Sequence, residues 1–395
     1  MVLGSSTAAG VGASRYEKSW VGQFVLLMQG RGFRVINSSI SGSNTATSLA
    51  RFDTDVAALR PDFVVLATSI VNEGFVAAPQ AAWDRYVANT RDLVRKVVSI
   101  GAMPIVAGMY PADVYSDINV SLLHKLYLAE ESLGTPIWDF WGSVAGTTGR
   151  WLPGMTNDGL HPSDLGHLYL FNSIPLTYFD QAYDGSSLLG GVASSVFVSP
   201  EPEDGSEIGR IDVSMDRPAM SWTIAAWIKD AGHSDWRVYL RAGSSSGEHF
   251  RLERQAGDLV IREGETVALR VPLELLLDQP IWSHIALTYQ QSTSLLRLFL
   301  NGVERASVNT VSTEALTNFE FGSGCAGCAF ADLVTYRSSL ESDSIRQLAN
   351  GIIPRRSLEF WGTPESTRGS GQQSGANHSV HYDERHLENA TRIHG

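Results

Sequence analysis

The period of the hydrophobic pattern changes near the middle of the chain, and this change constrains the fold more than any other feature. Up to about Asp180, short apolar runs typical of buried strands alternate with amphipathic stretches typical of helices. Such alternation predicts a three-layer α/β domain, in which helices cover both faces of a mostly parallel sheet. The expected strands are 34–41, 61–69, 103–111 and 135–143, and the expected helices are 19–30, 45–60, 81–101 and 121–134.

After about Ser194 the apolar residues alternate with polar ones, as in half-buried strands. The dipeptide Asn301-Gly302 is typical of a hairpin turn between two such strands. We expect an all-β jelly-roll sandwich here. The expected strands of this half lie at 223–229, 236–243, 249–255, 258–264, 282–290 and 295–304.

Four segments follow from this change of pattern. The first domain is placed at 1–185, a Gly/Ser-rich linker at 186–194 and the jelly roll at 195–361. The polar segment 362–395 has few residues that can form a core, and we expect it to be a disordered tail. Each of the two domains is expected to fold independently, so that a fragment cut near Gly190 would still fold.

The overall composition excludes some classes of function. Hydrophobic residues make up 43% of the 395 residues and charged residues 18%, and no apolar run is long enough to cross a bilayer. The formal net charge is -12, whereas nucleic-acid binding depends on clustered Lys and Arg. We therefore expect no integral membrane segment and no nucleic-acid partner.

The two cysteines, Cys325 and Cys328, form a single CxxC sequence. One such pair cannot complete a zinc site with four ligands, and its flanks lack the pattern of a thioredoxin-like redox motif. The sequence favours a local disulfide or two small buried thiols over a redox role. We expect neither a metal ion nor a cofactor.

Polar residues or glycine lie at the ends of several predicted strands. Ser6 follows the first apolar residues, Gly42 and Asn72 follow later strands, and Asp158 lies three residues before His161. Taken singly, each has a structural explanation as a turn residue, a helix cap or a surface side chain. Together they supply what nucleophilic catalysis needs, because a serine hydroxyl requires a nearby base, a carboxylate and donors for an oxyanion.

With these motifs in view, the first 180 residues or so resemble the SGNH (GDSL-like) hydrolase family. Residues 4–6 read Gly-Ser-Ser where the family has Gly-Asp-Ser, and residues 41–45 match its Ser-Gly-x-x-Thr turn. Residues 70–73 read Ile-Val-Asn-Glu in place of Gly-x-Asn-Asp, so the Asn is kept and its neighbours differ. Residues 158–162 match the Asp-x-x-His-Pro block in full.

This resemblance implies a flavodoxin-like parallel sheet and a role for each matching residue. Ser6 would be the nucleophile, His161 the general base and Asp158 the carboxylate that orients the imidazole. The backbone N–H groups of Ser6 and Gly42 and the side-chain amide of Asn72 would form the oxyanion hole.

The second half resembles laminin-G-like, concanavalin-A-like jelly rolls at the level of its strands. Domains of this type contact carbohydrate, bind calcium or act as spacers, and no carboxylate cluster here has calcium-binding spacing. The sequence favours packing roles over sugar platforms for four of its ring side chains, because large aromatic residues mostly serve burial. These are Trp222, Trp227, Trp282 and His284.

We therefore expect a serine esterase that removes short acyl groups, acetyl above all, from a carbohydrate or another small ester. Two alternatives remain open: a lipid-directed esterase or thioesterase, and a non-catalytic glycan-binding or adhesion protein. Only Met1, Val2 and Leu3 precede the first turn, so the first strand is short or the natural N-terminus, with any signal peptide, lies upstream. The family and the jelly roll favour an extracytoplasmic location.

Overall fold

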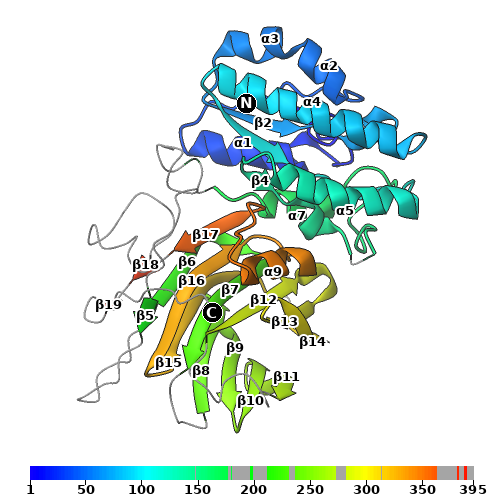
Figure 1. The fold of residues 1–395 in the computed structure, drawn as a ribbon. Coiled ribbons are helices and arrows are strands. Elements are labelled where there is room, and N and C mark those ends of the chain that lie inside the picture. Colours follow the sequence, from blue (N-terminus) through cyan, green and yellow to red (C-terminus); the bar gives the residue numbers. More distant parts are fainter. Residues whose placement is uncertain are drawn as a thin grey trace. The chain divides into compact units, whose positions relative to one another are not determined.

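The computed structural model describes residues 1–146, 148–176, 179, 196–198, 211–230, 236–272, 282–312, 314–362, 380–381 and 387–388. The chain divides into two compact units, which are described separately (Figure 1). The first comprises Met1–Ile174 together with Arg355–Ser357, and the second comprises Pro175–Pro354 and Leu358–Gly395. The predicted linker at 186–194 and most of the predicted tail at 362–395 lie outside the described residues.

The first unit is built on a four-stranded parallel sheet with the order β1-β2-β3-β4. Its strands are β1 (Val2–Gly4), β2 (Phe63–Ala67), β3 (Met103–Ala107) and β4 (Ile137–Trp138). Isolated parallel bridges extend both edges, because Asn37 pairs with Val2 and Arg356 pairs with Ile137. The predicted α/β domain with a parallel sheet is therefore confirmed.

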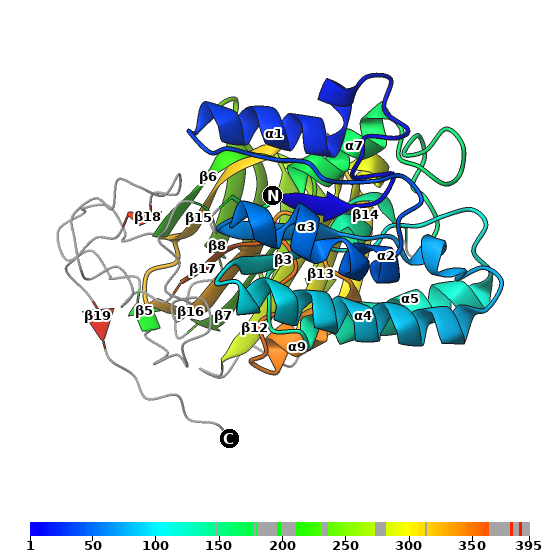
Figure 2. The ribbon, with the colours of Figure 1, turned by 90° about the horizontal axis from the view of Figure 1, so that it is seen from above.

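Helices lie on both faces of this sheet (Figure 2). Helix α1 packs against α7 on one side, and α4 packs against α2 and α5 on the other. The α-helices are α1 (Trp20–Gly30), α2 (Thr45–Ala50), α3 (Phe52–Asp55), α4 (Pro79–Ser99), α5 (Asp117–Glu131), α6 (Phe140–Val144) and α7 (Asp164–Asn172), and the 3₁₀ turns are η1 (Tyr16–Lys18), η2 (Ala57–Leu59) and η3 (Ile70–Glu73). Within the described part of the chain, no helix combines the length and apolar composition needed to span a membrane.

Three expected elements of this unit differ in the structure. Segment 34–41 runs beside β1, where the Ser38 and Ile40 N–H groups donate to the Val2 and Gly4 carbonyls at 2.8 and 3.1 Å, but its pairing amounts to a single bridge at Asn37 and not to a strand. The Ser38 carbonyl accepts from Arg51 Nη1 at 2.6 Å. The expected strand at 135–143 stops at Trp138, because Asp139 caps α6 by accepting the Gly142 N–H at 3.0 Å. The expected helix at 45–60 is divided into α2, α3 and η2.

Residues 355–357 complete the edge of this sheet beyond β4. The Ser357 N–H donates to the Ile137 carbonyl at 2.7 Å, and the Ser357 hydroxyl donates to the Ser173 carbonyl at 2.6 Å. Arg356 is fully buried in the first unit, where its guanidinium lies over the ring of Tyr127. A segment from late in the sequence is thus part of the core of the first unit.

The second unit contains two antiparallel sheets, with the orders β11-β10-β9-β8-β15-β6-β18 and β14-β13-β12-β7-β16-β5-β19. Asn301 and Gly302 have φ values of 51° and 78°, which confirms the predicted hairpin turn between β13 and β14. The two sheets and the hairpin agree with the expected jelly roll. The elements are β5 (Val196–Val198), β6 (Ile211–Ala219), β7 (Trp222–Asp230), β8 (Trp236–Ser244), β9 (Gly247–Gln255), β10 (Asp258–Glu263), β11 (Thr266–Pro272), β12 (Ser283–Gln290), η4 (Gln291–Thr293), β13 (Leu295–Leu300), β14 (Val303–Asn309), β15 (Leu316–Gly324), β16 (Cys328–Tyr336), α9 (Ser342–Ala349), β17 (Leu358–Gly362), β18 (Val380–His381) and β19 (Leu387–Glu388).

Four ring side chains of the second unit, those of Trp222, Trp227, Trp282 and His284, serve its packing. Trp222 is fully buried, and its ring contacts those of three other core aromatics, Phe250, Tyr289 and Phe319. His284 is also buried, and its ring lies edge-on to the half-buried Trp227. Trp227 and Trp282 pack against Ala329 and Ala331. These contacts agree with the packing roles predicted from the sequence.

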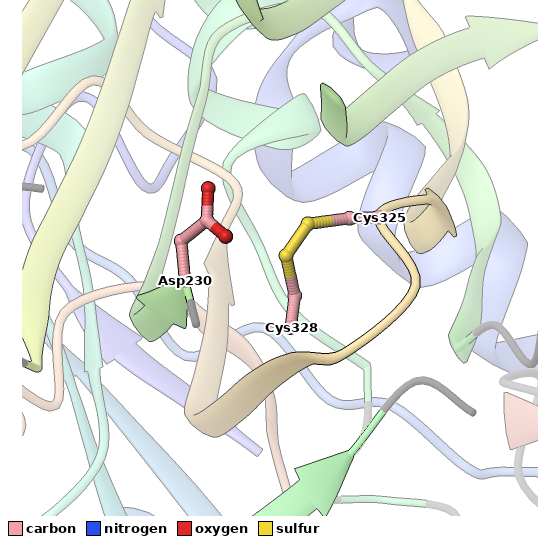
Figure 3. A group of neighbouring side chains, drawn as sticks. All are labelled: Asp230, Cys325 and Cys328. Atoms are coloured by element: carbon pink, nitrogen blue, oxygen red, sulfur yellow. A yellow bond between two sulfur atoms is a disulfide. The ribbon is translucent and has the colours of Figure 1, made fainter. Parts of the chain in front are cut away.

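Cys325 and Cys328 are joined by a disulfide in the buried turn between β15 and β16, which belong to different sheets. The carboxylate of Asp230 lies beside them (Figure 3). Sulfurs in a disulfide are not thiolate ligands, and Asp230 already accepts the Tyr239 hydroxyl at 2.7 Å and lies 3.5 Å from the Arg237 guanidinium. The cluster is therefore a structural one, and the disulfide is the first of the two alternatives expected from the sequence.

Candidate active site

Ser6 lies directly after β1, at the edge of the sheet where the parallel strands end. Gly4 makes this placement possible, because a Cβ at this position would lie 2.6 Å from the Ala67 carbonyl oxygen of the neighbouring strand. The Ser5 N–H donates to the same carbonyl at 3.1 Å, and the chain then turns, with the Val11 N–H donating to the Ser6 carbonyl at 3.0 Å. The Ser6 side chain is half-buried in this turn.

Asp158 and His161 lie in a loop just before α7. Thr156 shapes this loop, because its hydroxyl donates to the His161 carbonyl at 2.7 Å and accepts the Gly159 N–H at 2.9 Å. A Cβ at Gly12 would lie 2.8 Å from the Cβ of His161, so a glycine lets the nucleophile segment approach the loop closely. The fold thereby brings together residues that are 155 positions apart.

Ser6, His161 and Asp158 form a continuous chain of polar contacts. His161 Nε2 lies 3.0 Å from Ser6 Oγ, and His161 Nδ1 lies 2.9 Å from Asp158 Oδ2. The His161 side chain is only 17% exposed, whereas that of Asp158 is 54% exposed. The structure therefore brings together the three residues that the sequence motifs predicted as a nucleophile, a base and an orienting carboxylate.

Asp158 is held in its ionised form. Partial burial raises its pKa, but hydrogen bonds from the His161 N–H, the His161 side chain and the Leu160 N–H outweigh burial and lower the pKa to about 2. Oδ1 accepts the two N–H groups at 2.7 and 2.8 Å, which leaves Oδ2 for the imidazole. A carboxylate at Nδ1 holds the ring proton there, so that the Nε2 lone pair faces Ser6 Oγ.

The three predicted oxyanion donors lie in the segments that follow β1, the bridge at Asn37 and β2. Gly42 has a φ of 78° in a turn closed by the Ser43 N–H and the Ile40 carbonyl. Among the hydrogen bonds of the described residues, none uses the N–H of Ser6 or of Gly42. Both groups thus remain open to a further acceptor.

Asn72 lies in η3, and its side-chain amide has two partners. Nδ2 lies 2.6 Å from Ser5 Oγ and 3.0 Å from the Ser43 carbonyl oxygen. Asn72 is therefore tied both to the neighbour of Ser6 and to the neighbour of Gly42. An oxyanion would compete with these two acceptors for an amide proton.

Sequence reasoning did not single out three other polar residues around Ser6. The Thr7 hydroxyl donates to the Tyr110 hydroxyl at 2.6 Å, and the Tyr110 hydroxyl donates to Ser69 Oγ at 3.2 Å. Burial raises the pKa of Tyr110, so its hydroxyl stays protonated at neutral pH. A usable signal was their position, because Ser69 and Tyr110 follow β2 and β3 as Ser6 follows β1.

Comparison with known families agrees with this geometry. Residues 2–168 match the model of the GDSL-like Lipase/Acylhydrolase family. Residues 207–330 match the model of the Concanavalin A-like lectin/glucanases superfamily, and the predicted resemblance of both halves is thereby confirmed.

Individual relatives cover only part of the chain. Esterase TesA from Pseudomonas aeruginosa is 27% identical over 167 residues, which are 41% of this chain and 79% of that protein. A crystal structure of TesA is 24% identical and covers 43% of this chain and 92% of its own, with a TM-score of 0.36. A catalytic mutant of an acetylxylan esterase from Geobacillus stearothermophilus is 20% identical and covers 43% of this chain and 89% of its own, with a TM-score of 0.36.

Proposed function

We propose that this protein is a serine esterase whose nucleophile is Ser6. The observation that carries the proposal is the contact chain from Ser6 Oγ through His161 Nε2 at 3.0 Å and Nδ1 to Asp158 at 2.9 Å. A serine hydroxyl becomes an effective nucleophile when an adjacent base removes its proton and a third group orients that base. The 27% sequence identity to Esterase TesA and the match of residues 2–168 to the GDSL-like family model support the same chemistry.

The reaction would proceed in two acyl-transfer steps. Ser6 Oγ forms a bond to the carbonyl carbon of the ester while its proton passes to His161 Nε2, and the bond to the leaving alcohol then breaks as that alcohol takes the proton from His161. Water next attacks the acyl-serine, giving its proton to His161. The acid leaves as the proton returns to Ser6 Oγ, which restores the enzyme.

The negative oxygen formed in each step would be met by three donors. The N–H groups of Ser6 and Gly42 are open, and Asn72 Nδ2 would redirect one of its two N–H bonds from Ser5 Oγ or the Ser43 carbonyl to the oxyanion, to which it would donate a hydrogen bond. An oxyanion is a stronger acceptor than a hydroxyl or a carbonyl, so this exchange is favourable. Loss of one such donor costs on the order of a hundredfold in kcat.

We further propose that the substrate is a short acyl ester, acetyl above all, on a carbohydrate. The support for the carbohydrate is an analogy at the level of folds, because residues 207–330 match a superfamily of lectins and glucanases. Turnover of p-nitrophenyl esters from acetate to long acyl chains tests the acyl part. Acetate release from a panel of acetylated polysaccharides tests the sugar part.

The ester series also separates the two alternatives. The proposal expects the highest kcat/KM for acetate. A preference for long chains would instead indicate a lipid-directed esterase or thioesterase, and no turnover of any ester would indicate a glycan-binding or adhesion protein that does not hydrolyse.

A further inference from the structure

Glu73 is a buried carboxylate that the proposed chemistry leaves unexplained. It is the last residue of η3, directly after Asn72, and only 6% of it is exposed. The family pattern noted above has Asp at this position. Burial of a charged group is costly unless it is well hydrogen-bonded, so its partners are informative.

Both partners of Glu73 Oε1 belong to Thr45, three residues after Gly42. Oε1 accepts the Thr45 N–H at 2.6 Å and the Thr45 hydroxyl at 2.7 Å. Asn89 Nδ2, from α4, donates to the same hydroxyl at 2.9 Å. Because the hydroxyl oxygen accepts from Asn89, its own proton is directed to Glu73.

A second contact runs beside this one. Asn72 Nδ2 donates to the Ser43 carbonyl oxygen at 3.0 Å. Consecutive residues of η3 are thus fastened to the segment that carries Gly42, one by an amide and one by a carboxylate. Two adjacent contacts fix the relative position of the two segments better than one.

We propose that Glu73 is a positioning residue, which holds the Gly42 N–H and the Asn72 amide at the spacing that an oxyanion requires. This inference rests on the proposed esterase function. Oxyanion donors act because they are already in place when charge develops, so a loosened spacing lowers kcat. The Glu73 carboxylate is buried and occupied by Thr45, which leaves it unable to bind the ground-state substrate, so KM should change little.

The test compares Glu73→Ala and Glu73→Gln with the natural protein on p-nitrophenyl acetate. Glu73→Ala removes the acceptor, so its kcat should fall at least about tenfold and approach the decrease expected when one oxyanion donor is lost. KM should stay within about twofold of the natural value. Glu73→Gln keeps a carbonyl oxygen that can accept both bonds of Thr45, so its kcat should remain within about threefold. Glu130→Ala is a matched control, because Glu130 is also a buried carboxylate of the first unit, 1% exposed against 6% for Glu73. That control should lower the melting temperature and leave kcat unchanged.

A double-mutant cycle with Asn72→Ala separates positioning from general destabilisation. If Glu73 acts through the oxyanion donors, the loss of kcat in the double mutant should be smaller than the product of the two single losses. Two outcomes would overturn this inference and leave the esterase proposal standing. One is that the two losses of kcat multiply in the double mutant, and the other is that Glu73→Ala, assayed at a temperature where it is folded, has the kcat of the natural protein. Absence of turnover in the natural protein would overturn the esterase proposal and this inference with it.

Discussion

Nη2 of Arg356 lies 3.3 Å from Oε2 of Glu130, and both side chains are buried in the first unit. Burial raises the pKa of Glu130 to about 7, although the charge of Arg356 opposes this shift. Glu131 also accepts from this segment, with its Oε2 at 3.0 Å from the Arg355 N–H. The Arg356 Nε also lies 3.2 Å from Glu131 Oε1. A short segment that follows most of the second unit in sequence therefore supplies the cation for two carboxylates inside the first.

Arg356→Met should destabilise the protein, because it leaves Glu130 buried without its cation. Breaking a buried pair in this way costs about 3–5 kcal/mol of unfolding free energy. The raised pKa of Glu130 adds a pH dependence: the folded state favours the protonated form, so the loss should increase as pH rises through about 7. Urea unfolding at pH 5 and pH 8 measures both effects. An Arg356→Met/Glu130→Gln double mutant should recover part of the loss, and an Arg356→Met protein of natural stability at pH 8 would contradict this account.

A fragment that ends near Gly190 should not retain the stability of the first unit. The sequence led us to expect that this fragment folds, but the first unit also includes Arg355–Ser357. Without them β4 loses the N–H of Ser357 on the Ile137 carbonyl, and Glu130 loses Arg356. Circular dichroism during urea unfolding of the fragment and of the full chain tests this expectation. A fragment that unfolds cooperatively at the midpoint of the intact first unit would show that the segment is dispensable.

His167 should make stability fall in mild acid. Burial lowers the pKa of His167 to about 4, although the Val11 carbonyl oxygen, 3.1 Å from Nε2, opposes this shift. Nδ1 accepts the Trp20 N–H, as a neutral ring can. The unfolded chain, with a His pKa near 6.5, binds more protons between these values, so this contribution is complete above about pH 6.5 and is lost as pH falls toward 4. Between pH 7 and pH 5 the loss should be about 2 kcal/mol. The unfolding free energy of His167→Gln should lack this component, and parallel pH curves for the two proteins would exclude it.

Asp158→Asn should impair catalysis without unfolding the loop. An amide can still accept the N–H groups of Leu160 and His161, but it does not stabilise a charged imidazole and does not fix its tautomer. We expect kcat to fall about a hundredfold or more, yet by less than in Ser6→Ala, because water reaches this half-exposed carboxylate and partly replaces it. Steady-state kinetics on p-nitrophenyl acetate decide the matter. A fully active Asp158→Asn enzyme would remove Asp158 from the triad.

The candidate site was predictable because its residues lie in short contiguous motifs at strand ends. Ser6, Asn72 and the pair Asp158 and His161 are each identified by immediate neighbours in sequence, and a parallel sheet brings its carboxyl ends together. In the sequence, Glu73 is only a departure from the family pattern, because its partner Thr45 is 28 residues away and no periodicity connects the two residues.

Other features depended on contacts that no local pattern encodes. Arg356 lies 226 residues from Glu130, and the short loop that carries it has no sequence feature that indicates a partner in the first unit. Segment 34–41 has the apolar residues of a strand and follows β1 as far as Ile40, but the Ser38 carbonyl accepts from the Arg51 side chain, and the pairing stays a single bridge at Asn37. The period of the hydrophobic pattern thus predicted the layers of the fold, and side-chain hydrogen bonds determined where the edge strands of the sheet stop.

The most direct test of the central claim is kcat on p-nitrophenyl acetate for Ser6→Ala, His161→Ala and the double mutant. Ser6 lies in a half-buried turn and His161 in a loop, and neither belongs to the apolar core, so circular dichroism should show all three proteins folded. Groups that act as one catalytic unit are strongly non-additive, so each single mutant should lose at least about 10⁴-fold in kcat and the double mutant no more than about threefold beyond that. A Ser6→Ala protein that retains kcat within about tenfold of the natural enzyme would contradict the assignment of Ser6 as the nucleophile.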